Sequence, residues 1–148
     1  MKKIFIASDH RGFYKKAELS DMLRENQYEV NDLGPLVYNP SDDFNDGAIT
    51  VAKSVLAEPD SIGILLCGSA AGICMQANRF KGIRAVACYN KDIAEISRKH
   101  NDANIICLPA DFLSAPEMFD IFKVFISTSF EQDERFIRRN QRLDEEQQ

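Results

Sequence analysis

Short, continuous apolar runs alternate along this sequence with longer segments in which apolar residues recur at helical spacing. The run 62–66 (IGILL) is the clearest short one, and it lacks the polar alternation of a strand that faces water on one side. Segment 12–26 shows the helical pattern, with apolar residues three and four positions apart. This alternation predicts an α/β protein in which helices cover both faces of a parallel sheet.

The same pattern sets approximate bounds for each element. The predicted strands are 3–7, 28–30, 62–66, 83–88 and 104–108. The predicted helices are 12–26, 46–57, 71–78, 92–100, 116–129 and 133–145. No repeat, low-complexity segment or linker divides the 148 residues, so we expect one domain over 1–148. The last helix, within about 131–146, is highly charged, and we expect it to extend from the domain and pack on a partner subunit.

Composition argues against several classes of partner. The net charge of −5 is unlike that of a nucleic-acid-binding protein. No apolar run approaches the roughly 20 residues that span a bilayer, and the apolar start is too short for a signal peptide. The four cysteines form no CxxC pair, which predicts free thiols in a reducing, cytoplasmic compartment. Metal-binding, Walker and GxGxxG motifs are missing, so we expect neither a metal nor a cofactor.

Polar clusters follow the predicted strands where a ligand site is expected. In open α/β sheets, ligands bind beyond the carboxyl ends of the strands. This rule selects 8–12 after the first strand, 67–72 after the third and 89–90 after the fourth. The cluster 100–104 instead precedes the fifth strand, so its participation in the same pocket would require a second subunit.

Cys67 is the sharpest of these features. It ends a buried strand, and Gly68 and a predicted helix follow it. Backbone N–H groups and the positive end of the helix dipole lower a thiol's pKa, which suits a nucleophile or a general base. A small buried apolar residue is the competing interpretation. For Cys74, Cys88 and Cys107, which lie within predicted elements, we favour a role in the core.

The other candidates also have two interpretations. Asp9 either orients His10, which would bind a phosphate, or caps the helix that follows. His100 closes a helix whose C-terminal dipole favours a charged imidazole. The last predicted helix carries a series of arginines on one face, which either binds phosphate or is a solvated surface balanced by acidic neighbours. These arginines are Arg135, Arg138, Arg139 and Arg142.

Taken together, the clusters carry a family resemblance. They are 7–12 (ASDHRG), 67–69 (CGS) with 72–73 and 77–79, 100–104 (HNDAN), and Arg135 with 138–139. In this order and spacing the chain resembles the ribose-5-phosphate isomerase B family, which includes the galactose-6-phosphate isomerase subunits. The resemblance covers nearly the whole chain, and the HNDAN and CGS strings are its most specific parts.

The resemblance implies a fold, an assembly and a reaction. The fold would be a three-layer, Rossmann-like subunit with a five-stranded parallel sheet. The subunits would form a homodimer or a dimer of dimers, with sites between subunits and the C-terminal helix reaching across. The reaction would interconvert an aldose phosphate and a ketose phosphate through a cis-enediolate, without a metal.

The resemblance also implies roles for individual residues. Cys67 would be the base that moves the proton between C1 and C2, and Ser69 would hold the enediolate oxygen together with loop amides. These amides belong to the segment Gly68 to Gly72, which includes Ala71. His100, with Asp43, would open the sugar ring.

Further residues would bind the substrate in this scheme. Asp9 and Asn101 would bind hydroxyls or shuttle protons. The phosphate would be held by His10, Arg135 and Arg139.

Several positions depart from the family pattern. Ala70 and Ala71 stand in the loop where the family usually has Gly-x, and a methyl group there restricts positive φ angles. Pro109-Ala110-Asp111 replaces Gly-Ala-Arg, which puts a carboxylate where an arginine would help bind phosphate. Phe136 replaces a histidine in the tail. If Asp111 faces the anion, Asp111→Arg should tighten phosphate binding.

Three functional hypotheses follow. The first is isomerisation of ribose 5-phosphate to ribulose 5-phosphate. The second is isomerisation of a six-carbon or differently charged sugar, which the change at Asp111 motivates. The third is a non-catalytic sugar-phosphate-binding protein whose loop is disabled by Ala70 and Ala71.

Overall fold

The computed structural model of the chain describes residues 1–146, and its centre is a five-stranded parallel sheet. The strands lie in the order β2-β1-β3-β5-β4. They are β1 Lys3–Ser8, β2 Glu29–Asp32, β3 Ile62–Cys67, β4 Ala85–Ala87 and β5 Ile105–Pro109. Every pairing is parallel, as the continuous apolar runs predict.

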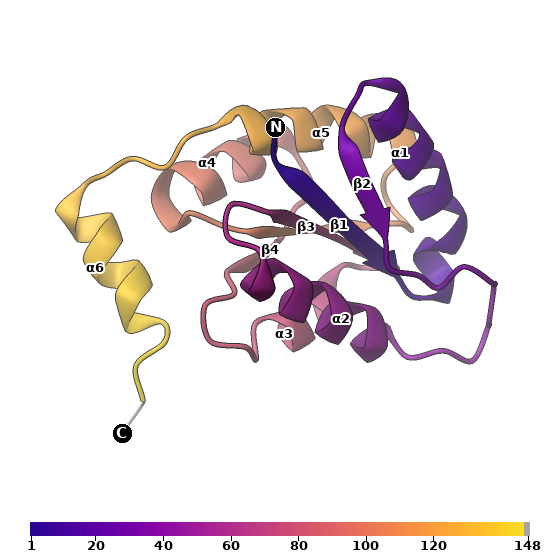
Figure 1. Cartoon of the computed structure of the whole chain (residues 1–148), viewed down its shortest axis with the longest axis horizontal. Helices are drawn as coiled ribbons and strands as arrows, with labels where there is room; N and C mark the ends of the chain where they lie inside the picture. The colour runs from indigo at the N-terminus through magenta and orange to yellow at the C-terminus, as the bar shows by residue number, and fades with distance from the viewer. Residues whose placement is uncertain (147–148) are drawn as a thin grey trace.

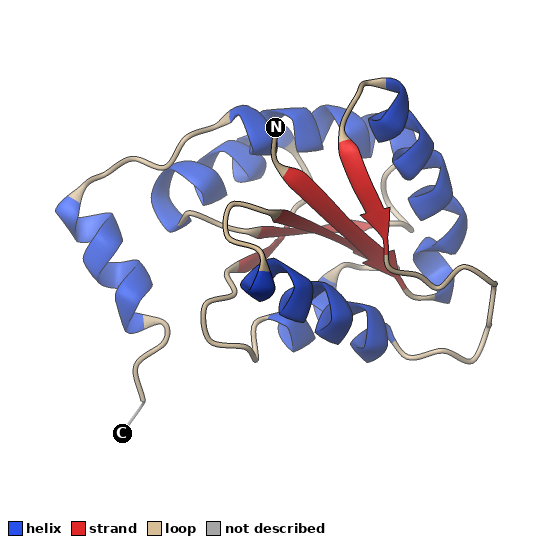
Figure 2. Cartoon of the chain, viewed as in Figure 1, coloured by secondary structure: helices blue, strands red, loops and turns tan. Residues whose placement is uncertain are grey.

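Helices cover both faces of this sheet, so the predicted three-layer α/β fold is confirmed (Figures 1 and 2). One layer holds α1 (Phe13–Glu25), α4 (Lys91–Asn101) and α5 (Ala115–Ser127). The other holds α2 (Phe44–Ala57) and α3 (Ala71–Ala77). A short 3-10 helix, η1 (His10–Gly12), precedes α1, and α6 (Glu134–Arg142) stands beside the domain.

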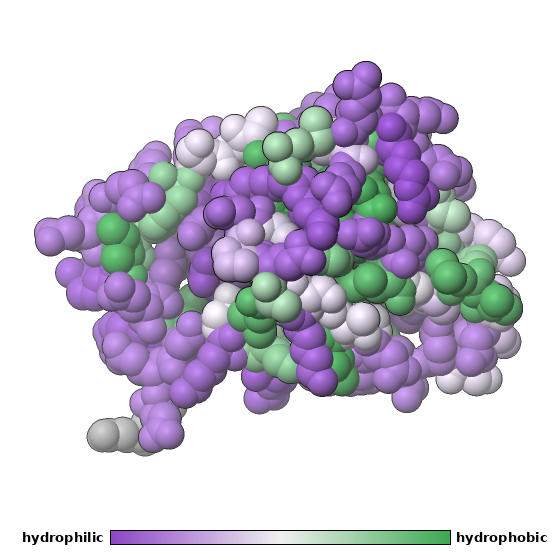
Figure 3. All heavy atoms as spheres, in the orientation of Figure 1, coloured by the Kyte–Doolittle hydropathy of each residue, from purple (hydrophilic) through white to green (hydrophobic). Residues whose placement is uncertain are grey.

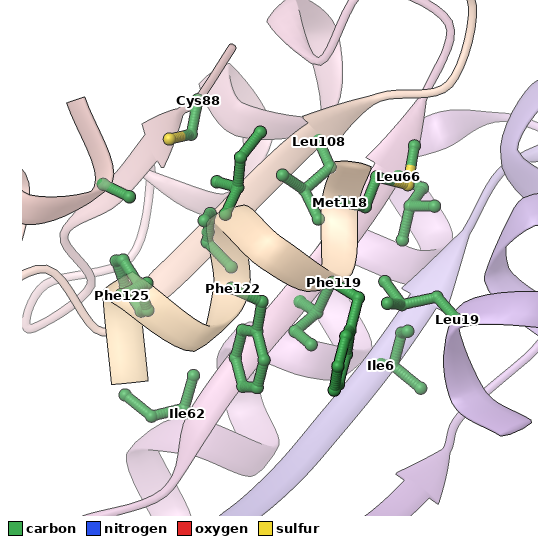
Figure 4. Packing of buried hydrophobic residues seen from close by; sticks show 14 of the residues in the cluster. Ile6, Leu19, Ile62, Leu66, Cys88, Leu108, Met118, Phe119, Phe122 and Phe125 are labelled. Carbon is green, nitrogen blue, oxygen red and sulfur yellow. The ribbon is translucent and has the colours of Figure 1, made fainter. Parts of the chain in front are cut away.

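Each face of the sheet has its own hydrophobic core. Figure 4 shows the larger one, in which Phe122 and Phe125 of α5 pack against strand residues such as Ile62. The smaller core lies under α2 and α3 and includes Val51, Ile73 and the Cys67 side chain. Because both faces are covered, the inner strands β1, β3 and β5 are buried on both sides, which explains their apolar sequence, whereas the edge strands β2 and β4 are only partly buried.

The element bounds differ from the sequence-based ones mainly at the sheet edge. We predict the fourth strand over 83–88, but β4 holds only Ala85–Ala87. Ile83 is buried without being part of the strand, because its backbone N–H donates to the Phe80 carbonyl at 3.1 Å in the preceding turn. The next N–H, of Arg84, donates to the Asn104 side chain at 2.8 Å rather than to a neighbouring strand. Apolar content alone therefore overestimates the length of this edge strand.

The carboxyl ends of β1 and β3 bring two loops into close contact. A Cβ atom on Gly12 would lie 2.7 Å from Cβ of Leu66, so only glycine allows η1 to approach β3 this closely. The backbone N–H of Asp9 donates to the Leu66 carbonyl at 3.1 Å. The segment after β1 is thereby held against the segment that begins at Cys67.

Helix α6 contacts the end of α4 in its own chain and lies beyond the amino ends of the strands (Figure 1). The Asn140 amide donates to the His100 carbonyl at 3.0 Å, and the Gly82 N–H donates to the Asp144 carboxylate at 3.1 Å. The surface over this helix is largely hydrophilic (Figure 3). No helix in the described part of the chain is long and apolar enough to cross a membrane.

Candidate active site

Cys67 ends β3 in a buried position, 5% exposed, above the smaller core. Burial raises the pKa of its thiol, while the backbone N–H groups of Ile73, Ala70 and Ser69 lower it. The predicted influence of the loop amides is therefore present, but the net shift of the pKa is upward. The expectation of a lowered pKa is wrong for this single chain, because the cost of burying a charged sulfur outweighs those hydrogen bonds.

The loop after Cys67 turns sharply into α3. Ala70 has a φ of +67° and is fully buried, so its methyl group does not prevent the left-handed conformation that the loop requires. The Tyr89 hydroxyl donates to the Ser69 carbonyl at 2.6 Å, and the Ala71 N–H donates to Ser69 Oγ at 3.2 Å. A Cβ on Gly72 would meet the Phe44 ring at 2.8 Å, so this glycine lets α2 and α3 pack closely.

Asp9 caps η1, which agrees with the capping interpretation. Its carboxylate accepts from the backbone N–H groups of Arg11 at 3.0 Å and Gly12 at 3.2 Å. Burial raises the pKa of Asp9, and the Gly12 hydrogen bond opposes that shift. Asp9 and Cys67 also interact, since the carboxylate charge raises the pKa of the thiol. Asp9 therefore both caps η1 and lies close enough to Cys67 to affect its pKa.

His10 is held by Asp42, which is not among the candidate residues predicted from the sequence. The Oδ1 atom of Asp42 lies 2.8 Å from His10 Nδ1 and accepts from the His10 backbone N–H at 2.8 Å. Asp43, the adjacent candidate, is the N-cap residue of α2 and its side chain makes no capping hydrogen bond. Both aspartates line a cavity of about 180 Å³ together with Ser8. The contact between Asp42 and His10 depends on the conformation of this loop, which no periodicity in the sequence specifies.

The remaining candidates lie beyond the amino ends of the strands, on α6 and at the end of α4. The His100 ring stacks on Phe136 of α6, with centroids 4.3 Å apart. The Asn101 amide donates to Asn140 Oδ1 at 3.3 Å. Arg135 is exposed and donates to its neighbour Asp133, with Nη2 2.9 Å from Oδ2, and Arg139 is exposed on the same helix.

Sheet register separates these two groups of residues within one chain. Cys67 pairs with Pro109 at the carboxyl ends of β3 and β5, whereas Gly63 pairs with Ile105 at their amino ends. The rise of a parallel strand puts about 13 Å between these two levels. His100 precedes β5, so this chain does not bring it to Cys67 or to Asp43. The place of the cluster 100–104, before the fifth strand in the sequence, predicts this division.

Asp111 forms an ion pair with Arg11. The Nε atom of Arg11 donates to Asp111 Oδ2 at 3.0 Å, and the Nη2 atom bonds the same oxygen. Arg11 follows β1 and Asp111 follows β5, and these two strands flank β3. A cue was present in the sequence, because an arginine and an aspartate follow strands on either side of the same central strand.

The family-specific sequence profile of ribose and galactose isomerases matches residues 4–144, which is nearly the whole chain. The chain belongs to the ribose/galactose isomerase family. The matched range begins in β1 and extends past α6, so it covers both groups of candidate residues.

Curated relatives in this family carry related names. A probable ribose-5-phosphate isomerase B from Mycoplasma pneumoniae is 40% identical over 128 residues, covering 86% of this chain and 84% of the relative. A putative sugar phosphate isomerase from Bacillus subtilis is 34% identical over 128 residues and covers 86% of each chain. The chain therefore spans most of the length of the family members it matches.

Solved structures share the fold. The ribose 5-phosphate isomerase from Thermotoga maritima superposes with a TM-score of 0.92 at 40% identity, covering 97% of both chains. Ribose-5-phosphate isomerase B from Mycoplasma genitalium, solved with bound ribulose-5-phosphate, has a TM-score of 0.90 at 37% identity. That match covers 95% of this chain and 93% of the other. The Rossmann-like α/β architecture is that of this enzyme family.

Proposed function

We propose that this protein interconverts ribose 5-phosphate and ribulose 5-phosphate, with Cys67 as the base. The observation that carries the proposal is the place of Cys67, buried at the carboxyl end of a central strand with loop N–H groups directed at its sulfur. The relatives named as ribose-5-phosphate isomerases support the choice of substrate.

The proposed reaction moves one proton between neighbouring carbons. The Cys67 thiolate takes the proton from C2 of the open-chain aldose, and the electron pair of that C–H bond forms the C1–C2 double bond of an enediolate. The electrons of the C1 carbonyl move onto O1 as the enediolate forms. The thiol then returns the proton to C1, and the proton of the C2 hydroxyl moves to O1, so that C2 becomes the ketone and C1 carries the hydroxyl. Ser69 and the amides of the 68–72 loop hold the developing oxyanion, and Asp9 binds a hydroxyl or shuttles a proton.

We propose that the complete site needs two chains, as a homodimer or a dimer of dimers. Each chain places Cys67 at the carboxyl ends of its strands and His100 beyond their amino ends, which supports a site shared between subunits. His100 of one chain would open the sugar ring beside Asp43 of the other, and Asn101 would bind a hydroxyl. The exposed Arg135 and Arg139 would then join His10 at the phosphate.

This arrangement also gives a physical route to the thiolate. Burial raises the pKa of Cys67 in the single chain. Cationic side chains that arrive from a second chain lower a nearby thiol's pKa, because they stabilise its charged form. We place the reaction in the cytoplasm, and the four free cysteines support a reducing compartment. We propose no cofactor for this step, since proton transfer needs none.

The test is to incubate the purified protein with ribose 5-phosphate and follow the formation of ribulose 5-phosphate. Cys67→Ala should abolish turnover and the exchange of the C2 proton with deuterated water. Cys74→Ala is the matched control, because Cys74 is a half-buried thiol of α3 outside the proposed site. Wild-type protein that turns over no pentose or hexose phosphate, or an active Cys67→Ala variant, would overturn the proposal.

A further inference from the structure

Two consecutive residues after β1 are each held by a carboxylate from a distant part of the chain. His10 is held through Nδ1 by Asp42, which lies in the loop before α2. Arg11 is held through Nε and Nη2 by Asp111, which follows β5. Asp42 contacts one side of the His10 imidazole, and Asp111 contacts one side of the Arg11 guanidinium. Among residues 1–146, no side-chain hydrogen bond is made by His10 Nε2 or Arg11 Nη1 on the opposite sides.

The Arg11–Asp111 pair lies directly over the residue that follows Cys67. A Cβ atom on Gly68 would be 2.6 Å from Arg11 Nε and 2.8 Å from Asp111 Oδ2. The Asp111 N–H donates to the Gly68 carbonyl at 3.0 Å, which fixes the two loops together. Arg11 is therefore placed beside the proposed reacting group and not at a remote surface.

The Arg11 guanidinium has donors left over for a ligand. Both of its bonds go to the single oxygen Oδ2, and Nη1 donates to no residue among 1–146. The side chain is 57% exposed, so a ligand can reach it. A guanidinium that is fixed along one edge and free at another suits a multivalent anion such as a phosphate.

We propose that Arg11 binds the anionic group of the substrate and that Asp111 is the positioning residue that holds it. This inference rests on the sugar-phosphate substrate proposed above and adds a binding residue to it. The aspartate at 111 is then not an opposing charge, because the ion pair with Arg11 neutralises it. The nearby Lys15 ammonium, which donates to the Ala110 carbonyl, adds to the positive charge at this junction.

Inorganic phosphate is the direct probe, and its binding is measured by calorimetry on the full chain. Arg11→Met should weaken phosphate binding by about tenfold or more, since one charged hydrogen-bonding partner is lost. Arg24→Met is the matched control, because Arg24 is an exposed arginine of α1 whose Nη1 atom lies 3.8 Å from Asp21 Oδ1. Equal phosphate affinity in wild type and Arg11→Met would overturn the proposal.

The positioning role of Asp111 has a separate readout. Asp111→Asn should weaken phosphate binding and raise KM for ribose 5-phosphate while changing kcat by no more than about twofold. Tighter phosphate binding in Asp111→Asn would show that the carboxylate only opposes the anion. The double variant Arg11→Asp with Asp111→Arg returns a guanidinium to the same point over Gly68, so it should recover affinity that Arg11→Asp alone loses.

The two proposals fail in different ways. If wild-type protein turned over no sugar phosphate but lost phosphate affinity in Arg11→Met, the isomerase proposal would fail and the anion site would stand. If turnover were normal and phosphate affinity insensitive to Arg11, the isomerase proposal would stand and the role of Arg11 would be rejected.

Discussion

The Nζ atom of Lys16 lies 2.6 Å from Oδ1 of Asp32, and the lysine side chain is only 2% exposed. The same ammonium donates to the Pro35 carbonyl at 2.9 Å, and the Gly34 N–H donates to Asp32 Oδ1 at 2.8 Å. One buried cation therefore ties α1 to the start of the loop that carries Asp42. The position of His10 depends on this loop, so a core ion pair supports the proposed phosphate site.

Removal of the Lys16 charge should destabilise the fold. Lys16→Met leaves the Asp32 carboxylate partly buried without its cation, and we expect a loss of about 3 kcal/mol in the free energy of unfolding. The measurement is urea denaturation. Lys123→Met is the control, because the exposed pair of Lys123 with Asp120 contributes little. A Lys16→Met variant as stable as this control would show that the buried pair does not hold the loop.

Asp42 should affect substrate binding through His10. Asp42→Asn removes the charge that holds the imidazole, and we expect a several-fold rise in KM for ribose 5-phosphate with the fold retained. Asp46→Asn is the matched variant, since Asp46 lines the same cavity, whereas the carboxylate that His10 contacts at 2.8 Å is that of Asp42. Steady-state kinetics on both variants provide the measurement. A larger effect at Asp46 than at Asp42 would contradict the assigned contact.

The buried thiols predict a loss of stability in alkali. Burial raises the pKa of Cys88 to about 11, whereas an unfolded cysteine titrates near about 8.5. Between these values the folded chain retains a proton that the unfolded chain has released, so stability falls as pH rises. Cys88→Ser removes this ionisation, and its stability should decline less steeply across that range in denaturant titrations. An unchanged slope would contradict the raised pKa.

The fold could be predicted from sequence because its signals are local. The three inner strands are apolar runs, and the run at 62–66 lies in the centre of the sheet, between β1 and β5. The glycine at 12 and the polar residues after Ala7 and Leu66 also mark the carboxyl edge correctly. The order of the elements and the carboxyl ends of β1 and β3 follow from periodicity and topology, which a single sequence contains.

The features of the candidate site that the sequence does not predict are contacts between distant segments. Asp42 meets His10 across 32 positions, and Arg11 meets Asp111 across 100 positions. No periodicity relates such residues, and the loop conformation decides whether Asp42 or Asp43 faces the histidine. The thiol's pKa was predicted in the wrong direction for a similar reason, because burial depends on the packing of α3 and its neighbours over Cys67.

The paired Asp111 also changes the expected effect of Asp111→Arg. In the structure this substitution puts a second guanidinium against Arg11, and the two charges repel. Phosphate binding should therefore not tighten in the single variant, although it should in a background that lacks the Arg11 charge, such as Arg11→Ala. Calorimetry with inorganic phosphate on the single and double variants measures this difference. Equal tightening in both backgrounds would show that Arg11 does not occupy the position.

The most direct test is to mix two inactive variants, Cys67→Ala and His100→Ala, after dissociation and reassociation of the subunits. In a hybrid dimer, a site that takes Cys67 from one chain and His100 from the other is intact at one of its two positions. Random reassociation makes half of the dimers hybrids, so about a quarter of wild-type turnover should return. If both residues act from the same chain, every site keeps one lesion, and mixing should restore no activity.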